Sequence, residues 1–111
     1  MTAYATALIL TVAVEVPLYA VGLSRLATLA RWRAARIGLA VNAVSHPLAF
    51  LVAWPLLRAP LGRAAALVLI EVAVMVGEAW AVRRLAGDTA AALITAAVAN
   101  SASLTIGLAL L

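Results

Sequence analysis

Three glutamates interrupt long apolar stretches of this sequence. Glu15 is followed two residues later by Pro17, and Glu71 and Glu78 are seven residues apart. The seven-residue spacing places Glu71 and Glu78 two turns apart on one face of a helix. A charged residue at the centre of a membrane span costs at least about 2.5–3.5 kcal/mol, so ionisable residues inside apolar stretches indicate a functional site. The three carboxyl groups therefore form the core of a candidate site for cations or protons.

Amide, hydroxyl and imidazole groups interrupt the other apolar stretches. Asn42 and His46 are four residues apart, with Ser45 beside them, and Asn100 and Ser103 are three residues apart. Residues at these spacings share a helix face. The spacing therefore predicts one polar stripe on each of these two helices, and both stripes can face the glutamates.

A depth count at about 1.5 Å per residue sorts these polar residues into two layers. The layer near the middle of the membrane comprises Glu15, His46, Glu71 and Asn100, and the layer nearer to the cytoplasm comprises Asn42 and Glu78. The sequence thus predicts a single polar core in two layers, enclosed by helices.

The residue types in this core suit a metal ion. An imidazole, carboxylates and amide oxygens together bind divalent ions such as Zn, Mn, Fe or Co. We predict that Glu15, His46 and Glu71 are the metal ligands. The supporting polar residues are Asn42, Ser45, Glu78, Asn100 and Ser103. No established metal-binding motif fixes the spacing, and the alternative for His46 is a neutral imidazole that donates a hydrogen bond to a carbonyl or to Asn42.

Two further hypotheses use the same residues. Burial in an apolar medium disfavours the charged form of a carboxyl group, so the glutamates and His46 also fit a proton relay. The structural alternative is neutral carboxyl groups that hydrogen-bond between helices, at about 0.6 kcal/mol per bond on average. An intramembrane metal-dependent enzyme, with a Glu-activated water, is the third hypothesis. No nucleophile motif supports an enzyme, so no catalytic residue is assigned and a small, proton-coupled ion transporter or channel is favoured.

Four apolar segments are long enough to cross a bilayer, which takes about 20 residues. They are residues 3–23, 37–57, 64–82 and 90–111. The predicted fold is all-α, a polytopic membrane protein with one four-helix transmembrane domain over residues 1–111. Glu15 and Pro17 make the first segment unlike a signal peptide. Pro17 and Pro47 each leave a carbonyl without its helical donor, which predicts a kink or a broken helix at each.

The composition agrees with a membrane protein. The 111 residues are 68% hydrophobic and 11% charged, against about 45–50% and about 25% in soluble domains. Such a chain has too little polar surface for a water-soluble globule and too much apolar surface for a disordered segment. The absence of cysteine excludes a disulfide scaffold and thiolate metal sites.

All eight basic residues are arginines, and their distribution predicts the topology. Four lie in residues 24–36, two in 83–89 and two in 58–63. Because cytoplasmic loops carry the excess of basic residues, we expect 24–36 and 83–89 in the cytoplasm of a prokaryotic cell, with both termini outside its inner membrane. The net charge of +4 then reflects orientation in the lipid bilayer and not a nucleic-acid partner. The aromatic residues predicted to anchor the helices at the interfaces are Tyr4, Trp32, Trp54 and Trp80.

The two halves of the chain share short motifs. The segment Val14–Val16 matches Ile70–Val72, and Asn42–Ser45 matches Asn100–Ser103, at nearly equal separations. Such similarity predicts a parallel two-helix repeat with a pseudo-twofold axis along the membrane normal. The alternative is chance similarity among helices rich in Ala, Val and Leu. Because four helices make a thin wall around any pathway, we also expect a homo-oligomer.

The chain resembles two groups of membrane proteins. Its length, four helices and Glu15 are similar to the small multidrug resistance transporters, whose first helix carries an essential Glu. However, His46 and Glu71 are foreign to that pattern, and the arginine bias opposes the dual topology of that family. The chain more closely resembles a group of small prokaryotic four-helix membrane proteins with no assigned activity. The shared motifs are Glu-x-Pro at Glu15–Pro17, Asn-x-x-Ser/Thr-His-Pro at Asn42–Pro47, Glu-x6-Glu at Glu71–Glu78 and Ala-Asn-x-x-Ser at Ala99–Ser103. This resemblance implies that the motifs form one site.

Overall fold

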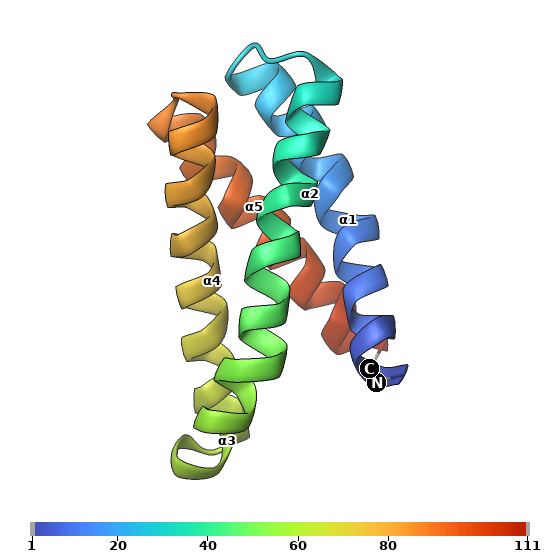
Figure 1. Cartoon of the computed structure of the whole chain (residues 1–111), viewed down its shortest axis with the longest axis vertical. Helices are drawn as coiled ribbons and strands as arrows, with labels where there is room; N and C mark the ends of the chain where they lie inside the picture. Colours follow the sequence, from blue (N-terminus) through green and yellow to red (C-terminus); the bar gives the residue numbers. More distant parts are fainter. Residues whose placement is uncertain (1, 111) are drawn as a thin grey trace.

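The computed structural model of the chain is all-helical (Figure 1). It describes residues 2–110, with side-chain surroundings for residues 5–106. In chain order the elements are α1 (Thr2–Leu26), α2 (Arg31–Pro47), the π-helix η1 (Leu48–Ala53), α3 (Trp54–Leu61), α4 (Arg63–Ala86) and α5 (Thr89–Leu110). Because α2, η1 and α3 follow one another without a break, they make one long helical arm.

Four helical segments are long and apolar enough to cross a membrane. They are Ala5–Leu26, Arg31–Leu61, Arg63–Ala86 and Thr89–Ile106. Large apolar side chains remain on the outside of the bundle, as Ile9 and Val44 illustrate with exposed fractions of 67% and 63%. Helices that satisfy their own backbone and expose such side chains are suited to hydrocarbon. The predicted all-α, four-helix architecture is therefore confirmed, and it is consistent with a multi-pass membrane protein.

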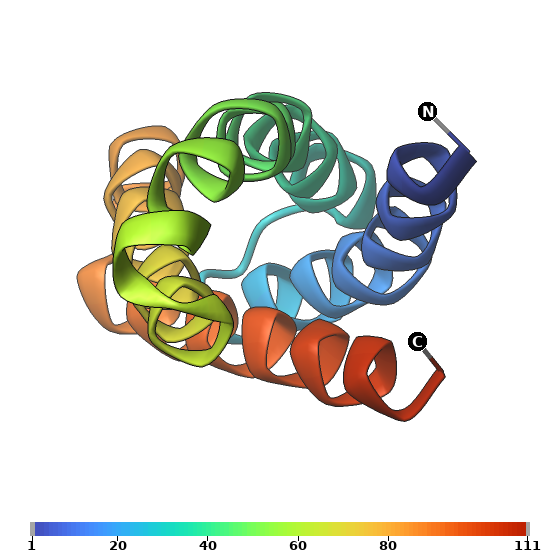
Figure 2. The same ribbon diagram turned by 90° about the horizontal axis from the view of Figure 1, so that it is seen from below.

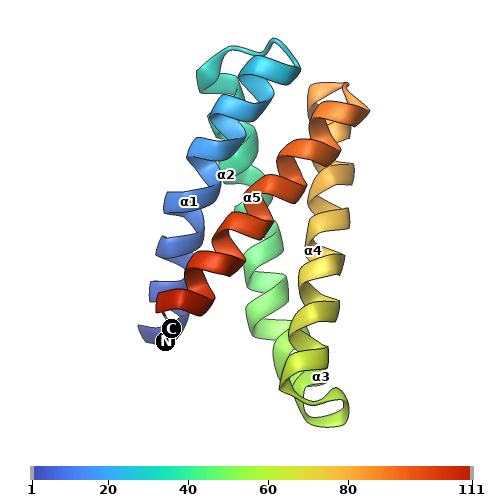
Figure 3. The same ribbon diagram turned by 180° about the vertical axis from the view of Figure 1, so that it is seen from behind.

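The four spans run alternately up and down (Figures 1 and 3). The α1–α2 and α4–α5 connections lie at one end of the bundle, and the α3–α4 turn lies at the other end together with the start of α1 and the end of α5. Viewed along the bundle, α1 packs against α2 and α5, and α4 packs against the same two helices (Figure 2). Helix α5 crosses the bundle obliquely (Figure 3). This ring of helices turns one face of each helix toward a shared interior.

The helices extend further than the sequence predicts. The predicted connections 24–36, 58–63 and 83–89 are mostly helical, and only residues 27–30, 62 and 87–88 lie between helices. Hydropathy marks where a chain leaves the hydrocarbon, whereas arginine is a good helix former that continues a helix beyond that point. The ends of α3 and α4 are instead set by Gly62 and Gly87, with φ of 83° and 77°, conformations that favour glycine. Asp88 caps α5, since its carboxylate accepts from the N–H of Ala91 at 2.9 Å.

The π-helix η1 lies between two prolines. Pro47 ends α2, and Pro55 occupies the first turn of α3. Neither proline has an N–H to donate, so the normal helical pattern is interrupted on both sides of η1. The N–H of Trp54 donates to the carbonyl oxygen of Ala49, five residues earlier. The interruption predicted at Pro47 thus takes the form of a widened turn, a rare feature often found at functional sites.

Two glycines allow α1 to approach its neighbours closely. A Cβ atom at Gly38 would lie 2.7 Å from the Cβ of Tyr19, and one at Gly22 would lie 2.8 Å from Oγ1 of Thr95. Small residues permit this close packing between membrane helices. The contacts join α1 to α2 at Gly38 and to α5 at Gly22.

Replacing Gly38 by Ala is expected to destabilise the bundle by about 1–3 kcal/mol, because the added methyl group overlaps a fully buried neighbour. The Cβ of Tyr19 cannot rotate away from this contact. Gly77→Ala on α4 is the matched control, since a Cβ there meets nothing within 4 Å. Unfolding by sodium dodecyl sulfate in mixed micelles measures both variants. If the two variants unfold at the same detergent fraction, the close approach of α1 and α2 at Gly38 is contradicted.

Candidate functional site

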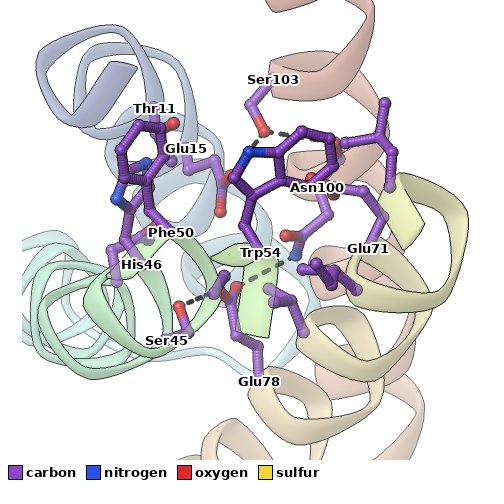
Figure 4. A pocket seen from close by; sticks show the side chains of 15 residues that line it. Thr11, Glu15, Ser45, His46, Phe50, Trp54, Glu71, Glu78, Asn100 and Ser103 are labelled. Atoms are coloured by element: carbon purple, nitrogen blue, oxygen red, sulfur yellow. Dashed lines mark hydrogen bonds between the residues drawn. The ribbon is translucent and has the colours of Figure 1, made fainter. Parts of the chain in front are cut away.

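A cavity of about 310 Å³ lies inside the bundle (Figure 4). Its walls include all eight polar residues singled out in the sequence, namely Glu15, Asn42, Ser45, His46, Glu71, Glu78, Asn100 and Ser103. These residues come from α1, α2, α4 and α5. The cavity is completed by Thr11 on α1 and by side chains of η1 and α3, including Phe50 and Trp54. All four spans therefore contribute to one polar site.

Glu78 on α4 is hydrogen-bonded to the three other spans. Its side chain is 1% exposed. Its Oε1 accepts from the Tyr19 hydroxyl at 2.7 Å and from the Asn100 amide at 3.0 Å, and its Oε2 accepts from the Ser45 hydroxyl at 2.5 Å. The donors lie on α1, α5 and α2. Because three donors satisfy this carboxyl group, its first role in the structure is to join the helices.

Tyr19 is a site residue that the sequence analysis missed. It is fully buried, and its hydroxyl reaches Glu78 because Gly38 lets α1 and α2 come close together. A single tyrosine in an apolar segment is equally typical of packing or of an interfacial position. A buried tyrosine hydroxyl needs a hydrogen-bond partner, but the sequence does not show whether Tyr19 is buried.

Glu15 on α1 has a different environment from Glu78. It is 2% exposed, and its Oε2 accepts from the Ser103 hydroxyl at 2.5 Å. Its Oε1 accepts no hydrogen bond within the part of the chain that the structure describes. The side chain of Asn42 lies beside it, and one of the two amide hydrogens of Asn42 is donated to the carbonyl oxygen of Gly38 at 2.8 Å. A buried acceptor without a donor costs about 1–3 kcal/mol, so a ligand or a water that contacted this oxygen would remove that cost.

His46 and Glu71 lie on opposite walls of the cavity (Figure 4). The His46 ring stacks on Phe50 of η1, with ring centroids 6.1 Å apart. Glu71 lies two turns before Glu78 on α4. Among residues 5–106, no three His, Cys, Asp or Glu side chains are grouped closely enough to hold a metal ion. The predicted ligands Glu15, His46 and Glu71 therefore share a cavity without forming a close triad.

The two predicted layers are joined in the structure. Asn100 belongs to the predicted middle layer, yet its amide donates to Glu78 of the other layer. Depth along α5 does not follow a count of about 1.5 Å per residue because this helix is tilted across the bundle (Figure 3). The polar groups of the two layers therefore make one continuous cluster.

The aromatic residues divide into two groups. Trp32 and Trp80 are 82% and 62% exposed, as a position at the membrane interface requires. Trp54 instead lines the polar cavity beside η1. The side chain of Tyr4 lies outside the described residues.

Comparisons with family models, with curated proteins and with solved structures find no match. The interpretation of the site therefore depends on its own residues and geometry.

Proposed function

We propose that this chain is a membrane protein whose polar cavity binds a hydrated divalent cation and carries it across the bilayer, as a small transporter or channel. The observation that supports this most strongly is the buried Oε1 of Glu15. Glu15 lines a cavity whose other walls carry Glu71 and Glu78, and its Oε1 accepts no hydrogen bond among the described residues. Ionisable groups within membrane spans mark ion and proton pathways, and carboxylate oxygens are ligands that divalent cations prefer.

The cation is held with part of its water shell. A cavity of about 310 Å³ has room for several water molecules besides the ion. Glu15 is the first proposed ligand, and Glu71 and His46 complete the site from the other walls, directly or through water. Carboxylate, imidazole and water are suitable ligands for Mn²⁺, and the same set accepts Zn, Fe or Co.

The three glutamates have different proposed roles. Glu78 holds the helices together through three hydrogen bonds, whereas Glu15 has one oxygen that accepts no hydrogen bond among the described residues. Carboxyl ligands must lose their protons before they bind a metal ion, so cation binding releases protons into the cavity. Exchange of a proton for a cation at Glu15 is the simplest form of proton coupling.

We also propose that the two halves of the chain are pseudo-twofold repeats. Asn42 and Asn100 make equivalent hydrogen bonds to the carbonyl oxygens of Gly38 and Ala96, both at 2.8 Å. Around the ring the helices contact one another in the order α1, α2, α4 and α5, and exchanging the pair α1–α2 with the pair α4–α5 leaves this order unchanged. The arginine-rich connections are proposed to face the cytoplasm, and a second copy of the chain is proposed to thicken the wall around the pathway.

A flux assay tests the transport function. Liposomes that contain the protein and an internal Mn²⁺-sensitive dye are expected to take up Mn²⁺ faster than empty liposomes. Glu15→Gln is expected to reduce this rate about tenfold or more, because the ligand charge is lost. Ser101→Ala removes an exposed hydroxyl from α5 and is expected to retain the wild-type rate. Wild-type liposomes that admit neither Mn²⁺ nor Zn²⁺ above the empty control would contradict transport.

A further inference from the structure

A second cavity, of about 550 Å³, opens between α2 and α4 on the outside of the bundle. We call it the α2–α4 groove. Its walls are almost entirely apolar, and small residues create the space, namely Ala40 on α2 and Ala73 and Gly77 on α4. Val44 and Trp80 in its walls are 63% and 62% exposed. A surface of this kind within the membrane spans faces the lipid chains.

Two arginines lie at one end of the groove, near the C-terminus of α4. Trp80 and Leu85 line this end. The guanidinium carbon of Arg84 lies 5.9 Å from the centroid of a Trp80 ring, and Arg33 on α2 donates to the carbonyl oxygen of Leu85 at 3.3 Å. Both arginine side chains are exposed. The groove therefore ends at a pair of positive charges where α4 reaches the membrane interface.

We propose that the α2–α4 groove is a binding site for an anionic phospholipid of the surrounding bilayer. One acyl chain lies along the apolar walls, and the phosphate group binds Arg33 and Arg84. Guanidinium groups match the geometry of phosphate oxygens, and basic residues at the membrane surface attract anionic lipids. A second, parallel copy of the chain is a poorer occupant, because it would bring its own arginines to the same end.

The lipid chain would also cover the polar site from outside. Ser45, Ile70 and Glu78 line both the groove and the polar cavity. The hydrogen bond from Ser45 to Glu78 joins α2 to α4 at this shared boundary. An acyl chain in the groove would therefore separate this bond from the bilayer and form part of the outer wall of the site. This role of the lipid does not depend on which cation the cavity binds.

Fluorescence quenching by brominated lipids tests the proposal, because Trp80 lines the groove. Trp32→Phe and Trp54→Phe together leave Trp80 as the only tryptophan. In proteoliposomes, a phosphatidylglycerol with brominated acyl chains is expected to associate with Trp80 about fivefold to 30-fold more strongly than the matching phosphatidylcholine, the effect of one to two interfacial arginines. Equal quenching by the two lipids would overturn the proposal. The proposal would also be overturned if neither lipid quenched Trp80, because protein would then cover the groove.

Arginine variants test the headgroup contact. Arg33→Gln with Arg84→Gln is expected to abolish the preference for the anionic lipid, and Arg84→Gln alone, which leaves Arg33 on Leu85, is expected to reduce it. Arg25→Gln with Arg31→Gln removes the same charge from the last turn of α1 and the first residue of α2, at the same end of the bundle, and is expected to leave the preference intact. If the Arg33 and Arg84 variants keep the full preference, or if the control pair loses it equally, Arg33 and Arg84 do not bind the lipid phosphate and the proposed site is refuted.

Discussion

Replacing Glu78 by Ala is expected to lower the free energy of unfolding by about 2–5 kcal/mol. The substitution removes the acceptor of Tyr19, Ser45 and Asn100 at once, and each hydrogen bond between membrane helices contributes about 0.6 kcal/mol on average and about 1.7 kcal/mol at most. The three donors come from three different helices, so the loss affects the whole bundle. Unfolding by sodium dodecyl sulfate in mixed micelles gives the free energy.

Glu78→Gln separates hydrogen bonding from charge. The amide oxygen of Gln can accept from Tyr19 and Asn100, and its amino group can donate to the Ser45 hydroxyl. We therefore expect Glu78→Gln to unfold within about 1 kcal/mol of the wild type. A Gln variant as unstable as the Ala variant would show that the charge of Glu78 is required, and an Ala variant as stable as the wild type would refute its role in joining the helices.

Replacing Glu15 by Gln is expected to weaken cation binding and to leave the free energy of unfolding nearly unchanged, unlike Glu78→Ala. Cation binding is expected to weaken about tenfold or more, because the carboxylate is the proposed first ligand and a neutral amide oxygen lacks its negative charge. Stability is expected to change by less than about 1 kcal/mol, because the amide oxygen can keep the hydrogen bond from Ser103. The same unfolding assay, combined with a Mn²⁺ titration of folded protein, measures both quantities.

The pair of variants at Glu15 and Glu78 therefore provides an internal control. If Glu15→Gln binds Mn²⁺ as tightly as the wild type, Glu15 is not a ligand. If Glu15→Gln and Glu78→Gln lose binding to the same extent, the division between a binding glutamate and a joining glutamate is wrong.

The location of the polar residues could be predicted from the sequence because two physical rules act together. Polar groups at helical spacing share a face, and a bilayer turns that face inward. Asn42 and His46 line the same cavity as Asn100 and Ser103 for this reason. Neither rule depends on knowing how the helices are connected or how closely they approach one another.

The pairing of these groups could not be predicted, because it depends on how the helices cross. The bond from Asn100 to Glu78 results from the tilt of α5, and the bond from Tyr19 results from the close approach at Gly38. The π-helix depends on two prolines eight residues apart, which indicate an interruption without giving its form. His46 stacks on Phe50 of this π-helix, so its distance from Glu15 and Glu71 could not be deduced from spacing either.

The most direct test of the central claim, that the polar cavity binds a divalent cation through Glu15, is Mn²⁺ binding to chelator-treated protein in detergent, measured by elemental analysis after removal of free metal. Wild type and Glu78→Gln are expected to retain Mn²⁺ in a stoichiometric amount at about ten times the wild-type Kd, and Glu15→Gln, at least about tenfold weaker, is expected to retain about half of that amount or less at the same metal concentration. Wild-type protein that retains no more Mn²⁺ than empty micelles, or a Glu15→Gln variant that retains the wild-type amount, would contradict the claim.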